Sequence, residues 1–164
     1  MILVTVGTQG PFDRLVRTVD DWAGEHAGHE IFAQIGPSEY QPQHVEFAAS
    51  MDPARFEQLL MRADVVISHA GMGTILRALE LGKPVLIMPR RASLGEQRNE
   101  HQLATAERFK KLGVVRVAAN ETELRSELDK LQTLSASKRI GDSASPQLLE
   151  RLRGFLIEHL GDPE

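Results

Sequence analysis

Apolar residues along the chain form short continuous runs that alternate with stripes at helical spacing. Short apolar runs bounded by turn residues are typical of buried strands, and apolar positions three and four apart indicate amphipathic helices. This pattern predicts strands at residues 2–6, 30–35, 44–48, 64–68, 84–88 and 113–118. It predicts helices opening at Pro11 and at Asp52-Pro53, and further helices at about 72–82 and 98–112. Asn120 with Glu123 resembles a capping box.

Strand and helix alternate throughout, and the strands are apolar on both faces. This predicts an α/β fold, a Rossmann-like parallel sheet with helices on both faces. The length of 164 residues favours a single domain, residues 1–164. Residues 132–147 are polar and rich in serine, which indicates a mobile loop, and an apolar stripe predicts a C-terminal helix at 146–160.

Composition narrows the function classes. The formal net charge of −4 argues against wholesale binding to nucleic acid. The chain contains no cysteine, which excludes disulfides and thiolate metal sites. No apolar run approaches the roughly 20 residues of a membrane span, and the N-terminus lacks a basic leader. We therefore expect a cytoplasmic protein.

Two glycine turns, residues 7–10 and 71–73, each lead from a predicted strand into a predicted helix. Ligands of parallel α/β sheets bind at the carboxyl ends of the strands, where free amides of helix N-termini attract anions. Missing side chains at Gly71 and Gly73 would let a phosphate approach the backbone. A tight packing turn explains either loop alone, but two at one sheet edge favour a phosphorylated ligand.

Neither turn is a dinucleotide fingerprint, because the third glycine and the acidic residue that ends the second strand are missing. The sequence also lacks a P-loop, a Gly-x-Ser-x-Gly elbow and an Asp-x-Asp pair. His26 and His29 have a spacing that suits a metal, but a solvated helix end is the better interpretation. We expect no metal site and no resident cofactor.

Three stretches carry a resemblance: "VTVGTQGPFDRLV" (4–16), "HAGMGTILRALELGKPVLIMP" (69–89) and "NEHQLATAERFKKLG" (99–113). Over roughly residues 1–118 the chain resembles the C-terminal, donor-binding half of the family 28 glycosyltransferases. It is similar in particular to the small catalytic subunits of split transferases. These include the eukaryotic enzyme that makes chitobiosyl-dolichol and bacterial exopolysaccharide enzymes, glucuronosyltransferase subunits among them. The resemblance implies one half of a GT-B fold, a UDP-sugar donor and metal-independent, inverting transfer.

The resemblance also implies site residues. Gly7, Thr8 and Gln9 match the loop that faces the diphosphate and the reacting centre. The residues that match the diphosphate cradle are His69, Ala70, Gly71, Met72, Gly73 and Thr74. His101 and Gln102 match the pair that contacts donor-sugar hydroxyls. The alternatives are a helix-start hydroxyl for Thr74 and an exposed helix residue for Gln102.

Two departures from the family pattern affect the site. Arg77 stands where the family commonly has the glutamate that holds the ribose, and Glu80, one turn later, is the candidate substitute. The loop after residue 89 adds Arg90, Arg91 and Arg98. Arginine forks suit carboxylates, which makes UDP-glucuronate a candidate donor. A solvated basic loop or a contact to an acidic lipid surface is the alternative.

These observations predict the donor-binding catalytic subunit of a two-component inverting glycosyltransferase. It would move a sugar from a UDP-sugar to a lipid-linked acceptor in exopolysaccharide biosynthesis. The expected partner is a membrane-anchored, Rossmann-like acceptor-binding subunit that recruits the chain to the cytoplasmic face of the membrane. The general base is expected on that partner, with His69 as the local candidate; loop packing or a phosphate contact is the alternative for His69. The rival functions are a non-catalytic nucleotide-binding regulatory module and a nucleotide-sugar epimerase of GT-B type.

Overall fold

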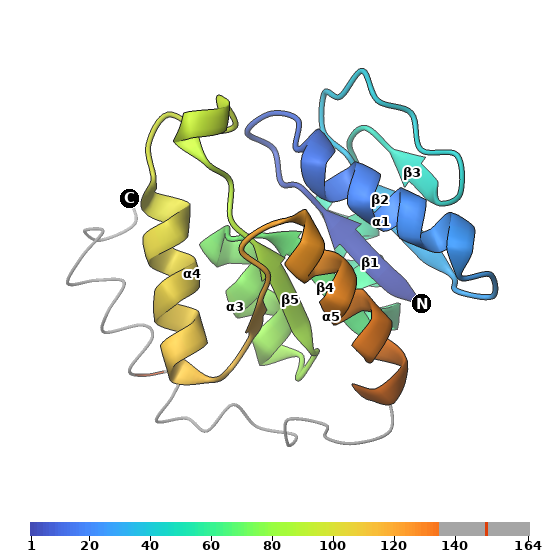
Figure 1. Ribbon diagram of the computed structural model, residues 1–164. Helices are drawn as coiled ribbons and strands as arrows, with labels where there is room; N and C mark the ends of the chain where they lie inside the picture. Colours follow the sequence, from blue (N-terminus) through green and yellow to red (C-terminus); the bar gives the residue numbers. More distant parts are fainter. Residues whose placement is uncertain (135–149, 151–164) are drawn as a thin grey trace.

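Six parallel strands form one sheet in the order β3-β2-β1-β4-β5-β6 (Figure 1). The computed structural model describes residues 1–134 and residue 150. The strands are β1 (Ile2–Thr5), β2 (Ile31–Gln34), β3 (Glu46–Ala48), β4 (Val65–His69), β5 (Val85–Met88) and β6 (Arg116–Val117). The chain runs outward from β1 to β3 and then crosses back to β4 on the other side of β1. The strand order therefore reverses between β1 and β4, the point where such sheets bind ligands.

Helices cover both faces of the sheet. They are α1 (Asp13–Glu25), α2 (Pro53–Arg62), α3 (Met72–Glu80), α4 (His101–Leu112) and α5 (Glu121–Leu134), with a 3₁₀ turn, η1, at Ala92–Leu94. Figure 1 shows α1 and α5 in front of the sheet and α3 behind it. The Rossmann-like α/β fold predicted from the sequence is confirmed.

Alternate residues of the central strands point to opposite faces, as the pleat of a strand requires. Val4 and Ile67 pack in one apolar cluster with side chains of α1 and α5. Leu3, Val66 and Ile87 pack in a second cluster with α2, α3 and α4. Because both faces are buried, the strands carry continuous apolar runs, which is why they could be located from the sequence.

The predicted elements are all present where the structure describes them, with shifts at their ends. The first helix begins at Asp13 rather than Pro11, the fourth begins at His101 rather than residue 98, and β6 shrinks to two residues. Helix α5 runs to Leu134, so the predicted loop at 132–147 begins inside a helix. The rest of that loop and the predicted helix at 146–160 lie outside the described residues, apart from Glu150. Within the described part, no helix is long and apolar enough to cross a membrane.

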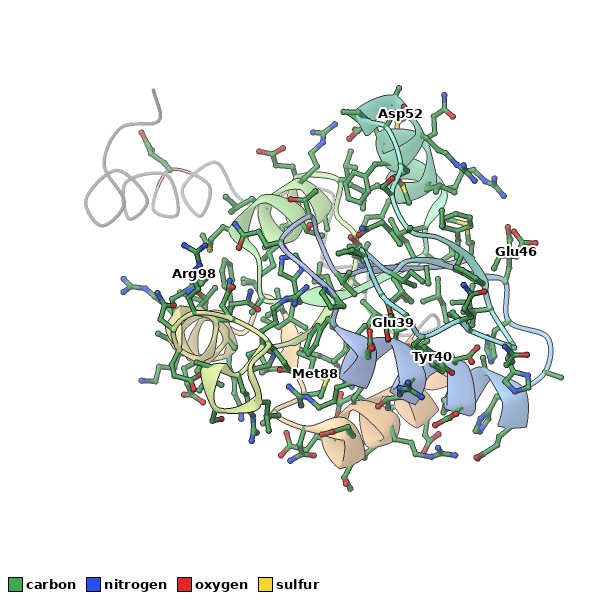
Figure 2. All side chains as sticks on the ribbon, turned by 90° about the horizontal axis from the view of Figure 1, so that it is seen from above. Glu39, Tyr40, Glu46, Asp52, Met88 and Arg98 are labelled. Atoms are coloured by element: carbon green, nitrogen blue, oxygen red, sulfur yellow. The ribbon has the colours of Figure 1, made fainter. Side chains whose placement is uncertain are left out.

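Helix α2 starts with a side-chain cap that the sequence predicted. The Asp52 Oδ1 atom accepts a hydrogen bond from the Arg55 amide at 2.9 Å, and Pro53 occupies the first turn. Figure 2 labels Asp52 at this helix start. The cap matters for the site because Ser50 and Met51, just before it, line the cavity described below.

Replacing Asp52 with alanine should lower the free energy of unfolding by about 1 kcal/mol, because one amide of the first turn loses its acceptor. Urea unfolding followed by circular dichroism measures the change. Asp52→Asn is the matched control, since its carbonyl oxygen can accept the same bond, and it should retain most of the stability. Equal losses in the two variants would show that charge, and not the hydrogen bond, stabilises this end.

Candidate functional site

A cavity of about 590 Å³ opens at the carboxyl edge of the sheet, at the switch point between β1 and β4. Its walls come from the turn after β1, the segment before and within α2, the start of α3 and the start of α4. The lining residues are Thr5, Gly7, Thr8, Gln9, Gln34, Ser50, Met51, Pro53, Phe56, His69, Gly71, Met72, Gly73, Thr74, His101 and Gln102. The structure thus brings together most residues singled out from the sequence; Ala70, Glu80, Arg90 and Arg91 are not among these wall residues.

The turn after β1 is held by a buried glutamine. Gln34, at the end of β2, accepts hydrogen bonds from the Thr5 hydroxyl at 2.7 Å and the Gly7 amide at 3.1 Å. Its amide group donates to the carbonyls of Gly7 at 3.0 Å and Ala49 at 3.2 Å. Gln34 therefore joins the turns after β1 and β3. Sequence reasoning missed it, although a glutamine inside an otherwise apolar strand was an available signal.

His69, the last residue of β4, lies between the two glycine turns. A Cβ built on Gly7 would fall 2.6 Å from its Cε1 atom, and a Cβ built on Gly71 would fall 2.7 Å from the same atom. Gly7 also has φ +73°, a conformation that favours glycine. A Cβ on Gly73, in contrast, would meet no described atom within 4 Å apart from its chain neighbours and the backbone of its own helix. Gly71 is therefore needed to seat the imidazole, whereas Gly73 leaves open space at the cavity wall.

The imidazole of His69 is neutral over the physiological pH range. Burial, followed by the nearby positive charge of Arg90, lowers the pKa of His69 from 6.5 to about 4, although the Thr5 backbone acts in the opposite direction. Its Nδ1 atom is buried and has no partner with hydrogen-bond geometry among residues 1–134. A group with so low a pKa is a weak proton acceptor at neutral pH. This environment favours packing or ligand contact over general-base chemistry for His69.

Gln102 joins the turns after β4 and β5. Its Oε1 atom accepts hydrogen bonds from the amides of Ala70 at 3.2 Å and Arg90 at 3.1 Å. The side chain is buried, so the interpretation of Gln102 as an exposed helix residue is wrong. Ala70 is buried as well and contributes its backbone rather than a cavity surface. Gln102 lines the cavity, and its side-chain amide donates to no described residue, so this amide can donate to a ligand.

The arginines after β5 divide into two groups. Arg90 is buried, and its guanidinium donates to four backbone carbonyls, while Arg91 donates to the carbonyl of Ala119 at 2.6 Å. The expectation that Arg90 and Arg91 face the sugar is therefore wrong: their side chains turn inward because buried carbonyls of neighbouring turns require donors.

Arg98 differs from these two because it is exposed. It lines a second hollow, of about 520 Å³, together with Gln9, Gln97, Asn99 and His101. Gln9 and His101 belong to both hollows, so the two adjoin. Figure 2 shows Arg98 beside α4, apart from Asp52 at the start of α2.

Glu80 does not take the position expected for a ribose ligand. Arg77 forms an ion pair with Glu80 at 3.1 Å and a second with Glu57 of α2. The partly exposed pair between Arg77 and Glu57 ties α3 to α2, and Glu80 is not among the wall residues of the cavity. The expectation that Glu80 replaces the family glutamate is therefore wrong, because its carboxylate pairs with Arg77 away from the cavity wall.

The segment that joins β3 to α2 supplies an apolar wall that sequence reasoning missed. Met51, Pro53 and Phe56 line the cavity together with the glycine turns. Their residue types gave no chemical signal. Their position after a strand of a parallel sheet was the available clue, because such segments lie at the carboxyl edge.

The described residues contain no group of three His, Cys, Asp or Glu side chains that could hold a metal ion. His26 stacks on Trp22 with ring centroids 4.6 Å apart, and His29 lies 5.0 Å from the same ring. These two histidines therefore pack around a buried tryptophan.

The family model of the glycosyltransferase family 28 C-terminal domain matches residues 1–148. The chain belongs to this family. One relative is the UDP-N-acetylglucosamine transferase subunit ALG13 of Homo sapiens, which is 33% identical over 122 residues. These residues are 68% of this chain but 10% of the human protein. The chain thus spans about a tenth of the length of that relative.

Solved structures similar to this family 28 domain agree on the fold. The NMR structure of ALG13 has a TM-score of 0.61 at 20% identity, with 98% of this chain and 96% of that chain covered. The calicheamicin glycosyltransferase CalG4 has a TM-score of 0.59 at 18% identity, with 98% and 43% covered. The UDP-GlcNAc 2-epimerase of Neisseria meningitidis, bound to UDP-GlcNAc, has a TM-score of 0.55 at 13% identity, with 96% and 44% covered. The domain therefore has the Rossmann-like architecture of one half of a GT-B fold.

Proposed function

We propose that this chain binds a UDP-sugar in the cavity at the switch point and is the donor-binding catalytic subunit of a two-component inverting glycosyltransferase. The observation that carries the proposal is the start of α3 at the cavity wall. Gly71, its N-cap residue, provides no side-chain cap for the first amides of the helix, and Gly73 leaves space beside them. Free amides and the helix dipole stabilise anions, as the leaving diphosphate of the donor requires.

The remaining walls suit the other parts of a nucleotide-sugar. Met51, Pro53 and Phe56 form an apolar surface against which a nucleobase can pack. The Gln102 amide is a donor for sugar hydroxyls, and the exposed His101 ring, whose Nδ1 donates to Asn99 Oδ1, can form a hydrogen bond with them through Nε2. We assign no residue to the ribose, because Arg77 and Glu80 neutralise each other outside the wall of the cavity. Catalysis then rests on positioning and on stabilisation of the leaving group.

The second component supplies the acceptor site in this proposal. The human relative is named as a transferase subunit, which supports a partner. We propose a membrane-anchored, Rossmann-like partner that binds a lipid-linked acceptor for exopolysaccharide synthesis and recruits this chain to the cytoplasmic face. The partner would also provide the general base, since a histidine with a pKa of about 4 is poorly matched to that task at neutral pH.

Two rival functions make different predictions. An epimerase would convert its UDP-sugar without an acceptor, and a regulatory module would bind the nucleotide without turnover beside any partner. Family membership and the 33% identical transferase subunit favour transfer. An assay of the chain mixed with a candidate partner and lipid-linked acceptor, with either component omitted in turn, distinguishes the three.

The isolated chain should bind UDP in the presence of a chelator, because the proposed site uses amides rather than a metal. Isothermal titration calorimetry measures this affinity. Gly73→Ala should weaken UDP binding about tenfold, equivalent to about 1.4 kcal/mol, since the new methyl group enters the space beside the helix amides. Clear binding of NAD with no binding of any uridine nucleotide would contradict the proposal.

The same titration tests the sugar. Arg98 is the loop arginine that lines a hollow next to the cavity. If it contacts a sugar carboxylate, Arg98→Gln should weaken UDP-glucuronate more than UDP-glucose or UDP-N-acetylglucosamine. Equal weakening of all three donors would contradict a glucuronate specificity based on Arg98.

A further inference from the structure

We propose that Arg90 is a positioning residue for donor binding: its buried guanidinium joins the turn after β1 to the loop after β5 and thereby sets the shape of the cavity. The part of this inference that concerns the donor rests on the proposed function. The structural part, that one side chain holds two loops of the site in fixed positions, depends only on the contacts of Arg90.

The contacts of Arg90 reach both loops. Its Nη2 atom donates to the carbonyls of Val6 and Gly10, each at 2.8 Å. Its Nη1 atom donates to the carbonyl of Pro11 at 2.5 Å and to that of Glu96 at 3.2 Å. Three acceptors therefore belong to the turn after β1, and the fourth belongs to the loop after β5. The guanidinium is 4.9 Å from the centroid of the Phe12 ring, which fixes its plane.

A second tether runs beside the first and meets it at Glu96. The Glu96 carboxylate accepts two hydrogen bonds from Arg14 of α1, at 2.8 and 2.9 Å, and one from the Arg91 amide at 2.9 Å. Both Arg14 and Glu96 are largely buried. Glu96 thus offers its backbone to Arg90 and its side chain to Arg14, so the loop after β5 is fixed to the first turn of α1.

The turn after β1 carries wall residues of the cavity, and the loop after β5 carries wall residues of the adjoining hollow. Gly7, Thr8 and Gln9 follow Val6 directly, and the Gln97 amide group, next to Glu96, donates to Gln9 Oε1 at 3.2 Å. The Arg90 amide is also one of the two donors to Gln102. Arg90 therefore holds together two loops whose neighbouring residues line the cavity and the adjoining hollow.

The geometry explains why this position carries arginine. Its flat fork presents donors along two edges and can satisfy carbonyls from separate segments at once. Lysine has one ammonium group that cannot reach all four acceptors, and an uncharged side chain would leave buried carbonyls without donors. The charge of Arg90 also contributes to keeping His69 unprotonated at the cavity wall. Loss of Arg90 should therefore alter loop geometry and the titration of His69 together.

The test uses the full chain with Arg90→Lys, which keeps the charge, Arg90→Met, which removes it, and Arg116→Met as the matched control. Arg116 is a partly exposed arginine whose partner is Glu127 of α5. We expect Arg90→Lys to weaken UDP binding about tenfold or more and to shift the amide NMR signals of residues 7–10 and 96–97, with the signals of β4 and β5 unchanged. Arg90→Met should also raise the pKa of the His69 ring measured by NMR, whereas Arg90→Lys should leave it low.

Each outcome decides the proposal. Native loop signals and native UDP affinity in a folded Arg90→Lys variant, with lower thermal stability alone, would overturn the positioning role. If Arg90→Met and Arg90→Lys fail to fold, Glu96→Gln loosens the same tether from its other side, and the same loop shifts and weaker UDP binding are expected; unchanged signals there would overturn the inference. If the unaltered chain binds no uridine nucleotide, the proposed function fails. The amide NMR signals of residues 7–10 and 96–97 then still test whether Arg90 holds the two loops together.

Discussion

Replacing Gly71 with alanine should destabilise the protein by about 1–3 kcal/mol, the usual cost of forcing an extra carbon into a packed site. The added Cβ would lie 2.7 Å from Cε1 and 2.9 Å from Cδ2 of His69, and closer still to Nε2. The ring also lies close to Gly7, so it would have to turn toward the cavity that it lines and lose its present packing. The backbone is not the cause: Gly71 has φ −90° and ψ 128°, which alanine adopts freely. Chemical unfolding measures the loss, and UDP binding should fall with it.

Two further variants separate this clash from other causes. Gly73→Ala adds the same methyl group two residues later, inside α3 and in open space, so its stability should match or exceed that of the unaltered chain. His69→Ala combined with Gly71→Ala removes the obstructing ring, and the double variant should be less destabilised than the two single losses added together. Additive losses would show that the His69 ring is not what Gly71 accommodates.

The free energy of unfolding should decrease as the pH falls from about 6.5 to about 4, and His69 should account for about 3 kcal/mol of that decrease at most. The sign follows from the lowered pKa: in this window the unfolded chain binds a proton at His69, whereas the folded chain does not. Protonation therefore favours the unfolded state. The cause is chiefly burial of the ring and secondly the charge of Arg90. Above pH 6.5 this contribution to stability is fully present.

The measurement compares urea unfolding of the unaltered chain with that of His69→Asn across this pH range. Asparagine is polar and does not titrate, so every other group contributes equally to both curves. The stability curve of the variant should be flatter, and the difference between the two should grow as the pH rises from 4 to 6.5. Parallel curves would mean that the His69 ring is accessible to protons in the folded protein and titrates near its ordinary pKa.

The order of the elements, the parallel α/β architecture and the family could all be predicted from the sequence. Strands buried on both faces must be apolar along their length, and their signal is local. The same holds for the ends of helices: Asp52 caps α2, and the Asn120 side chain accepts a hydrogen bond from the Glu123 amide at 2.9 Å, as the capping pattern predicted. The glycine turns could be assigned to one sheet edge because parallel strands bring their carboxyl ends together.

The direction of individual side chains depended on contacts between segments far apart in the chain. The sequence placed Arg90 and Arg91 in the loop after β5, but the carbonyls that turn Arg90 inward come from residues about eighty positions earlier. Gln34, which joins two turns across the sheet, and the wall formed by Met51 and Phe56 went unrecognised for the same reason. A pattern of residue types along the chain records which groups are polar, and not which distant donor or acceptor each will meet.

Gly71 illustrates the difference between what the sequence indicated and what the tertiary structure decided. The sequence indicated that something must approach the turn after β4 closely, and a phosphate was the hypothesis for both glycines. In the folded chain the imidazole of His69 occupies the space beside Gly71, while the space beside Gly73 is open. Local sequence determined that both positions lack a side chain, because the turn and the helix start are local structures. That the imidazole fills the space beside Gly71 depends on packing between β1 and β4, since this packing brings Gly7 close to the same ring.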